Sequence, residues 1–335
     1  MFRLTTLLAL LLAPADPSPE APNLRVAVDS AAREVVLEYR IPAPLGAHHA
    51  SGHGAHAHHL AHVQRLAQFS WPVTGWARGV SVELESASGT PLPRRVLHHV
   101  NLFNLERRQL VHAGIERLWA AGPETASVRL PATVGVRLAA GTRLALLVAF
   151  DPAELPEGSR VRVRVSWLPM NMTPRPMDVL PMQLSVNFRP GRTVAYDLPA
   201  GPSRRSFEFV VPISGRVLGA SGHLHDYGIA IRVEDVETGR TVIELRAERD
   251  SLGQIRGMPQ QLYGVAGRGR PLRAGRRYRI TADYDNTSGR AIPLGAMGEI
   301  AAIFAPDRAE EWPLLDLSDP DIAYDLAVLV GYEDR

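Results

Sequence analysis

Two histidines, one residue apart, carry the strongest chemical signal in this sequence. His223 and His225 lie in a run of β-forming residues that we expect to be a strand over 213–225. Alternate side chains of a strand point to the same face, so both imidazoles face the same way. Gly222 and Gly228 flank the pair, and glycine permits close approach of another backbone or a ligand. The pattern favours a metal site over two structural histidines.

Two other positions could supply ligands. His98 and His99 are adjacent, and neighbouring residues on a regular strand point to opposite faces. Both can reach one ion only at a β-bulge or a strand end; otherwise one is buried and the other exposed. Met297 stands between small residues and can present its sulfur atom without steric cover, although on its own it is better explained as an ordinary core residue.

Two segments have unusual compositions. Seven histidines fall between His48 and His62, mostly separated by alanine and glycine, which is typical of a metal-binding segment or of a solvated loop without a fixed site. The proline-rich stretch 169–182 also holds four methionines. Thioethers suit Cu(I), but methionines also fill gaps in packed interfaces, which is the simpler interpretation.

The composition excludes several classes of chemistry. The chain of 335 residues has no cysteine, so disulfides, thiolate metal sites and cysteine nucleophiles are ruled out. All 37 basic residues are arginine, which rules out lysine Schiff-base catalysis. The net charge is +2 and no basic run is present, so we expect no nucleic-acid partner.

The first 15 residues resemble a secretory signal peptide. One arginine precedes about ten mostly apolar residues, and Ala13-Pro14-Ala15 suits cleavage. A buried N-terminal helix is the alternative. We expect a secreted or periplasmic protein without a membrane span, because no other apolar segment is long enough to cross a bilayer.

Short alternating strands separated by turn residues predict an all-β protein with two antiparallel β-sandwiches in tandem. We place the first domain at 22–168, a linker at 169–182, the second domain at 183–310 and an acidic tail, packed on the surface, at 311–335. Only the segment 105–121 has a pattern that could be helical.

The order His98-His99, then His223-x-His225, then Met297 resembles the copper type II, ascorbate-dependent monooxygenases, the peptidylglycine α-hydroxylating and dopamine β-monooxygenase-like enzymes. The chain is most similar to secreted bacterial relatives of these enzymes. The match is best over 214–305 and weaker over 70–168. The resemblance implies that each half is a jelly-roll-like sandwich that carries one copper ion.

The resemblance also implies roles for these residues. His223, His225 and Met297 would hold the oxygen-activating copper, and His98 and His99 would hold a second copper that stores and passes an electron. Ascorbate or a similar reductant would reduce both ions. The implied reaction uses O2 to hydroxylate a C–H bond of an unknown small molecule.

The chain departs from the family pattern at several positions. The expected third histidine of the first domain is absent, and Ala149 or Asp151 occupies its place. Asp151, His112 or a histidine of the 48–62 segment could ligate instead.

Ser221, Glu299 and Ala301 replace the family's peptide-binding side chains, so a peptidylglycine substrate is not expected. A non-catalytic secreted protein that binds or buffers copper, and keeps the second-domain site, is the alternative to the enzyme. A β-sandwich interaction module with vestigial ligands is a third hypothesis.

Overall fold

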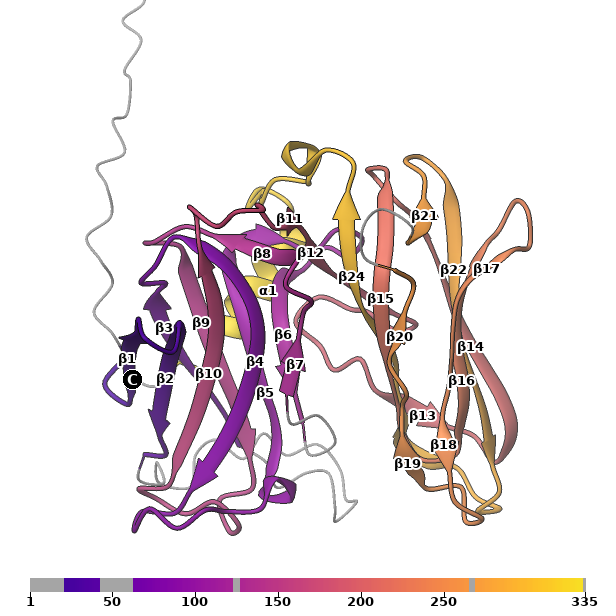
Figure 1. The fold of residues 1–335 in the computed structure, drawn as a ribbon. Coiled ribbons are helices and arrows are strands. Elements are labelled where there is room, and N and C mark those ends of the chain that lie inside the picture. Colours follow the sequence, from indigo (N-terminus) through magenta and orange to yellow (C-terminus); the bar gives the residue numbers. More distant parts are fainter. Residues whose placement is uncertain (1–20, 43–62, 123–126, 265–268, 334–335) are drawn as a thin grey trace, which may run out of the picture.

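The protein consists of two β-sandwiches side by side and a C-terminal tail that returns to the first (Figure 1). The computed structural model describes residues 21–42, 63–122, 127–264 and 269–333. The prediction of an all-β protein with two tandem antiparallel sandwiches is confirmed. The predicted signal peptide and the histidine-rich segment lie outside the described residues.

The first sandwich has one sheet in the order β1-β2-β10-β4-β8-β11, with β7 paired to β4, and a second sheet in the order β3-β9-β5-β6. Its strands are β1 Leu24–Asp29, β2 Glu34–Arg40, β3 Val63–Ser70, β4 Gly75–Glu85, β5 Leu97–Arg108, β6 Ile115–Ala121, β7 Ser127–Arg129, β8 Val134–Leu138, β9 Arg143–Phe150, β10 Arg160–Pro169 and β11 Met177–Asp178. A short 3-10 helix, η1 Arg94–Val96, precedes β5.

The second sandwich has sheets in the orders β12-β24-β15-β20, with β21 also paired to β15, and β14-β22-β16-β17. Two short pairs, β13-β23 and β18-β19, extend from it. Its strands are β12 Leu180–Ser185, β13 Tyr196–Leu198, β14 Gly201–Val210, β15 Gly215–Leu224, β16 Gly228–Asp235, β17 Thr241–Arg246, β18 Glu248–Arg249, β19 Ile255–Gly257, β20 Gln261–Leu262, β21 Arg270–Leu272, β22 Arg277–Asn286, β23 Ile292–Ala296 and β24 Gly298–Pro306.

Both sandwiches have the strand order of a jelly roll. If the eight main strands of each are counted along the chain, one sheet has the order 1-8-3-6 and the other 2-7-4-5. In the first sandwich these sheets are β2-β10-β4-β8 and β3-β9-β5-β6. Two interlocking Greek keys produce this order. The expectation of two jelly-roll-like domains is therefore confirmed.

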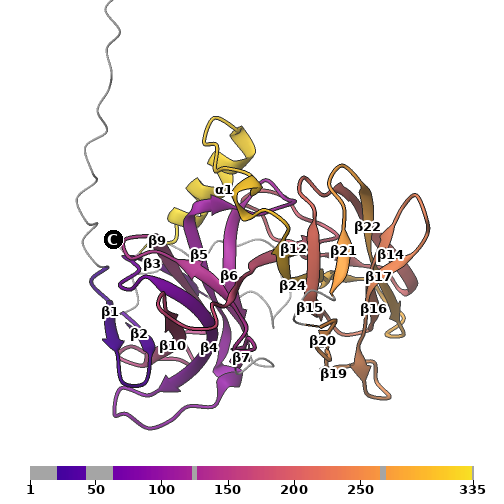
Figure 2. The same ribbon diagram turned by 45° about the horizontal axis from the view of Figure 1, so that its top comes forward.

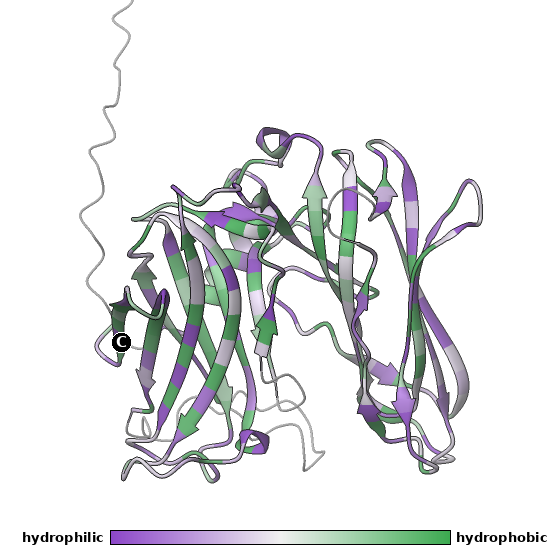
Figure 3. Cartoon of the chain, viewed as in Figure 1, coloured by the Kyte–Doolittle hydropathy of each residue, from purple (hydrophilic) through white to green (hydrophobic). Residues whose placement is uncertain are grey.

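The alternating sequence pattern explains why these segments form sandwiches. Along β10, the side chains of Val161, Val163 and Val165 are fully buried between the sheets. Arg162 and Arg164 point to the outer face and pair with carboxylates of neighbouring strands. The hydropathy colouring shows the same alternation along many strands (Figure 3). Burial of one face of each strand fixes the register, because a shift of one residue would expose the core face.

The tail packs against the outer face of the β3-β9-β5-β6 sheet (Figure 2). It contains the 3-10 helix η2 Ala309–Glu311 and the helix α1 Pro320–Val330, which buries Ile322 and Leu329 there. Asp325 accepts hydrogen bonds from the Ile115 N–H of the first sandwich at 2.8 Å and from the Gly191 N–H of the second at 2.9 Å. The tail therefore joins the two sandwiches. We find no helix in the described ranges with the length and apolar character that a membrane crossing requires.

Three expectations are wrong. Residues 320–330, outside the one segment expected to be helical, form the helix α1. The segment 105–121 is not helical: it forms the end of β5, a turn and β6. Gly114 in this turn packs so closely on Phe188 that a Cβ atom would lie 2.6 Å from its ring. The predicted linker 169–182 is also shorter than expected, because β11 pairs with the first sandwich and β12, which begins at Leu180, pairs with the second.

Candidate metal centre

The two histidines of the second sandwich lie where the sequence predicts. His223 is the penultimate residue of β15 and His225 follows the strand directly. Their ring centres are 5.4 Å apart and the rings are perpendicular. At this spacing, nitrogen atoms of both imidazoles can reach one ion at the usual bond length of about 2 Å.

Met297 lies beside the histidines, although it is more than 70 residues away in sequence. Strands β15 and β24 are antiparallel neighbours, with His223 opposite Glu299 and Leu224 opposite Gly298. Met297 directly precedes β24, so this pairing places it across from His225. The three predicted ligands therefore occupy adjacent positions at one end of one sheet.

A buried tyrosine from the opposite sheet holds the backbone of the candidate site in place through hydrogen bonds. The Tyr284 hydroxyl accepts hydrogen bonds from the His225 N–H at 3.1 Å and from the Met297 N–H at 3.0 Å. It also donates to the Met297 carbonyl oxygen. Burial raises the pKa of Tyr284 to about 12, so the phenol stays neutral and can donate at neutral pH. Tyr284 thus ties the histidine segment to the methionine segment.

The candidate ligands face the first sandwich. A Cβ atom on Gly222 would point into the core, 2.6 Å from the Met258 side chain, so His223 on the next position points outward. Its cross-strand neighbour Glu299 forms a salt bridge of 3.1 Å with Arg117 on β6. This ion pair crosses between the sandwiches and places the outer face of the histidine strand in the interface.

The adjacent histidines of the first sandwich stand at a β-bulge. Opposite β9, Leu97 pairs with Phe150 and His99 pairs with Ala149, which leaves His98 as the extra residue. The bulge turns both rings toward each other, with 2.8 Å between their Nδ1 atoms and ring centres 4.9 Å apart. A bulge is one of the two geometries in which adjacent histidines of a strand can both bind one ion.

Of the proposed third ligands, Asp151 lies near this pair. It follows Phe150, the partner of Leu97, at the same end of the sheet. Its Oδ1 atom accepts a hydrogen bond from the Ala153 N–H at 2.9 Å. Ala149, opposite His99, has no donor atom.

His112 cannot join the pair. It lies beyond the far end of β5, a strand of 12 residues, and so about 30 Å away. Its Nε2 atom accepts a hydrogen bond from the Ser185 N–H at 3.0 Å, and its ring stacks on Phe188 with centres 4.5 Å apart. Burial, together with nearby Arg108 and Arg117, lowers the pKa of His112 to about 4. His112 is therefore a neutral acceptor at the contact between the sandwiches.

The candidate centre depends on a methionine. Among the described residues, no group of three or more His, Cys, Asp or Glu side chains comes together in a form that could hold a metal ion. The first sandwich offers a histidine pair, and the second offers a histidine pair with Met297 beside it. Two imidazoles and a thioether form a soft donor set that accepts both Cu(I) and Cu(II).

Tyr284 and Arg117 also belong to the site, although the sequence did not predict them. An inward-facing tyrosine hydroxyl needs a hydrogen-bond partner, and the alternation of Tyr278, Ile280, Ala282 and Tyr284 along β22 does indicate an inward hydroxyl. Its partners, however, belong to the other sheet. No local signal identifies Arg117, because its partner Glu299 lies on the other sandwich.

Comparison with known proteins assigns no family to this chain. No protein-family model matches the chain, and no curated protein is significantly similar to it. Among solved structures, the major capsid protein P2 of bacteriophage PM2 is similar at a TM-score of 0.38 and 12% identity, over 74% of this chain and 98% of that one. PNGase F, a glycosylasparaginase from Flavobacterium meningosepticum, is similar at a TM-score of 0.38 and 8% identity, over 80% and 95%. A function for this chain must therefore be inferred from the chemistry of the site.

Proposed function

We propose that the protein is a copper-dependent monooxygenase that hydroxylates a C–H bond of a small molecule, with O2 and a reductant such as ascorbate. The observation that carries this proposal is that three candidate ligands from distant parts of the chain occupy adjacent positions at one end of one sheet. Strand pairing brings His223 and His225 beside Met297, and Tyr284 holds both segments. An ordinary packing role for all three side chains does not require this arrangement.

The donor set fits copper. The imidazoles of His223 and His225 and the thioether of Met297 suit both oxidation states of the ion, and the chain has no thiolate that would favour zinc. When bound, copper supplies one-electron redox chemistry and an open position for O2. The protein's own part is to hold these ligands at a strand end and to place them in the interface between the sandwiches.

His98 and His99 would hold the second copper. The bulge gives both rings access to one ion, which supports a ligand role over a purely structural one. Both the start of β5 and the end of β15 lie toward the lower end of the molecule in Figure 1. The two candidate sites thus share one end of the pair of sandwiches.

A specific observation favours the second candidate function, a non-catalytic copper-binding protein. In the part of the chain that the structure describes, no third histidine completes a metal-binding group with the histidine pair of the first sandwich, and Asp151, at the same end of the sheet, does not complete one either. A protein with only the second-sandwich centre could capture copper without multiple turnover.

Oxygen consumption by the copper-loaded protein tests the choice. We expect ascorbate-dependent O2 uptake that a substrate from a panel of small molecules stimulates, with one labelled oxygen atom incorporated into the product. The variant His223→Ala should abolish this stimulation, because it removes one of three ligands. Retention of copper without turnover of any panel member would instead support the copper-binding protein.

A further inference from the structure

A surface hollow in the second sandwich is lined by three arginines. It has a volume of about 450 Å³ and lies where β13 pairs with β23, beside the edge strand β14. Arg189, Arg192 and Arg205 line it, together with Tyr196. It is separate from the candidate ligands, although the Tyr196 ring lies edge-on to the ring of Tyr284 with 6.4 Å between centres.

Arg205 is held in place by uncharged groups. Its Nη2 atom donates a hydrogen bond to the Asn187 Oδ1 atom at 2.6 Å, and its guanidinium carbon lies 4.7 Å from the centre of the Tyr196 ring. The Asn187 amide nitrogen in turn donates to the carbonyl oxygens of Val194 and Ala195. These contacts orient the guanidinium group, and none of them involves a carboxylate.

The loop that carries the other two arginines is also anchored. Gly191 lies between them, and its N–H donates to Asp325 on α1 at 2.9 Å. Gly191 adopts a φ angle of 60°, and a Cβ atom there would lie 2.8 Å from the Tyr324 ring. The tail helix therefore fixes the path of this loop beside Arg205.

The hollow holds more guanidinium groups than carboxylates. Across the described residues, Arg189, Arg192 and Arg205 take part in no salt bridge, whereas Arg204, the neighbour of Arg205, pairs with Asp283 at 2.6 Å. The hollow contains one carboxylate, that of Asp197, whose Oδ1 atom accepts a hydrogen bond from the Leu294 N–H at 2.9 Å. Three guanidinium groups thus face a single carboxylate.

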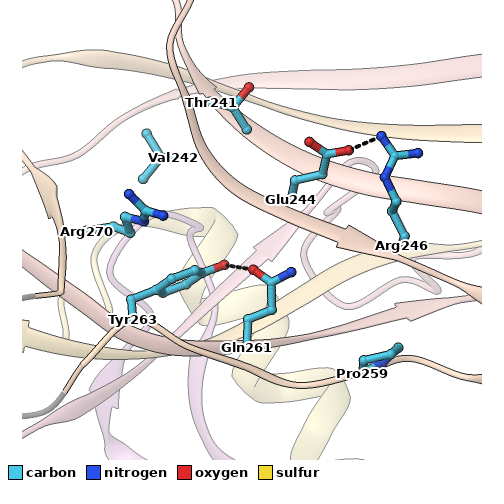
Figure 4. A pocket seen from close by; sticks show the side chains of 8 residues that line it. All are labelled: Thr241, Val242, Glu244, Arg246, Pro259, Gln261, Tyr263 and Arg270. Carbon is cyan, nitrogen blue, oxygen red and sulfur yellow. Dashed lines mark hydrogen bonds and ion pairs between the residues drawn. The ribbon is translucent and has the colours of Figure 1, made fainter.

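A comparison hollow shows the contrast. It lies between β17 and the strands β20 and β21, with a volume of about 470 Å³ (Figure 4). There Arg246 pairs with Glu244, and Tyr263 donates its hydroxyl to the Gln261 side chain at 2.8 Å. Arg270 lies over the ring of Tyr263 and forms no salt bridge with any described residue, so that hollow has a single guanidinium group without such a partner.

We propose that the arginine-lined hollow binds a small anion that carries a phosphate or a carboxylate group. Guanidinium groups pair with both through two parallel hydrogen bonds, and an arginine that is already oriented loses less conformational entropy on binding. This proposal is independent of copper, because none of the three arginines belongs to the candidate centre.

Calorimetric titration of the metal-free, full-length protein tests the proposal, with glycerol 3-phosphate and succinate as probes at equal ionic strength. We expect saturable binding of at least one probe, and the probe that binds more tightly identifies the anionic group. Arg205→Gln should weaken binding by about tenfold or more, as expected for the loss of a charge-assisted pair. Arg204→Gln is the matched control, because it removes an outward-facing arginine of the same strand and should leave binding unchanged.

The double variant Arg189→Gln/Arg192→Gln provides a second test, because both side chains are exposed and their loss spares the core. It should also weaken binding about tenfold. The proposal is overturned if neither probe binds saturably to the wild-type protein, or if folded variants that lack these arginines bind as tightly as the wild type.

Discussion

Replacement of Tyr284 by phenylalanine should loosen the candidate metal centre without removing a ligand. The phenol satisfies the N–H of His225 and both the N–H and the carbonyl of Met297. Its loss leaves three backbone groups unsatisfied at a buried position, so we expect the free energy of unfolding to fall by about 3 kcal/mol. Copper affinity should fall by about tenfold to a hundredfold, the usual cost of losing an outer-shell partner.

Tyr278→Phe is the matched control for this experiment. Tyr278 lies on the same face of β22 and is equally buried, and its hydroxyl accepts a hydrogen bond from the Arg273 N–H at 3.0 Å, away from the site. This variant should lose stability but retain copper affinity. Copper titrations would separate the two cases, together with the electron paramagnetic resonance spectrum of Cu(II), which reports ligand geometry. Equal copper affinities for the two variants would contradict a positioning role for Tyr284.

Acid should weaken the contact between the sandwiches through His112. The folded protein protonates this imidazole only near pH 4, whereas the unfolded chain does so near pH 6.5. The unfolded state therefore binds more protons between these values. The stabilisation is present above pH 6.5 and is lost as the pH falls toward 4, by about 3 kcal/mol in total.

The variant His112→Gln isolates this effect, because glutamine can still accept a hydrogen bond but does not titrate. Urea denaturation at pH 7 and pH 4 should show the wild type losing about 3 kcal/mol relative to the variant. The comparison needs the variant, because burial raises the pKa of Glu116 to about 7 and its titration contributes with the opposite sign in the same range. Parallel pH profiles of the two proteins would contradict the role of His112.

The sequence predicted the site best where the ligands lie close together on one strand, because the local geometry of the strand then decides their positions. Alternation along a strand correctly placed His223 and His225 near each other at a strand end. For His98 and His99 the same rule allowed two outcomes, a bulge or a split pair, and the pairing of β5 with β9 decided for the bulge. That decision involves residues about 50 positions away, so the local sequence could not make it.

Tertiary contacts explain the errors over 105–121 and 169–182. The spacing of apolar residues in 105–121 permits a helix, but β6 pairs with β5 along most of its length, and Gly114 is needed where the turn packs on Phe188. Propensity is a weak signal that such packing overrides. Likewise, prolines in 169–182 suggested a linker, yet the short strand β11 still finds a partner in β8.

The most direct test of the central proposal is X-ray absorption at the copper edge of the reduced, copper-loaded protein. We predict a sulfur ligand together with imidazole nitrogens in the wild type. Met297→Leu should remove the sulfur signal and leave the imidazole signal, because leucine matches methionine in volume but has no donor atom. A wild-type spectrum without sulfur, or a sulfur signal that persists in Met297→Leu, would contradict a copper centre formed by His223, His225 and Met297.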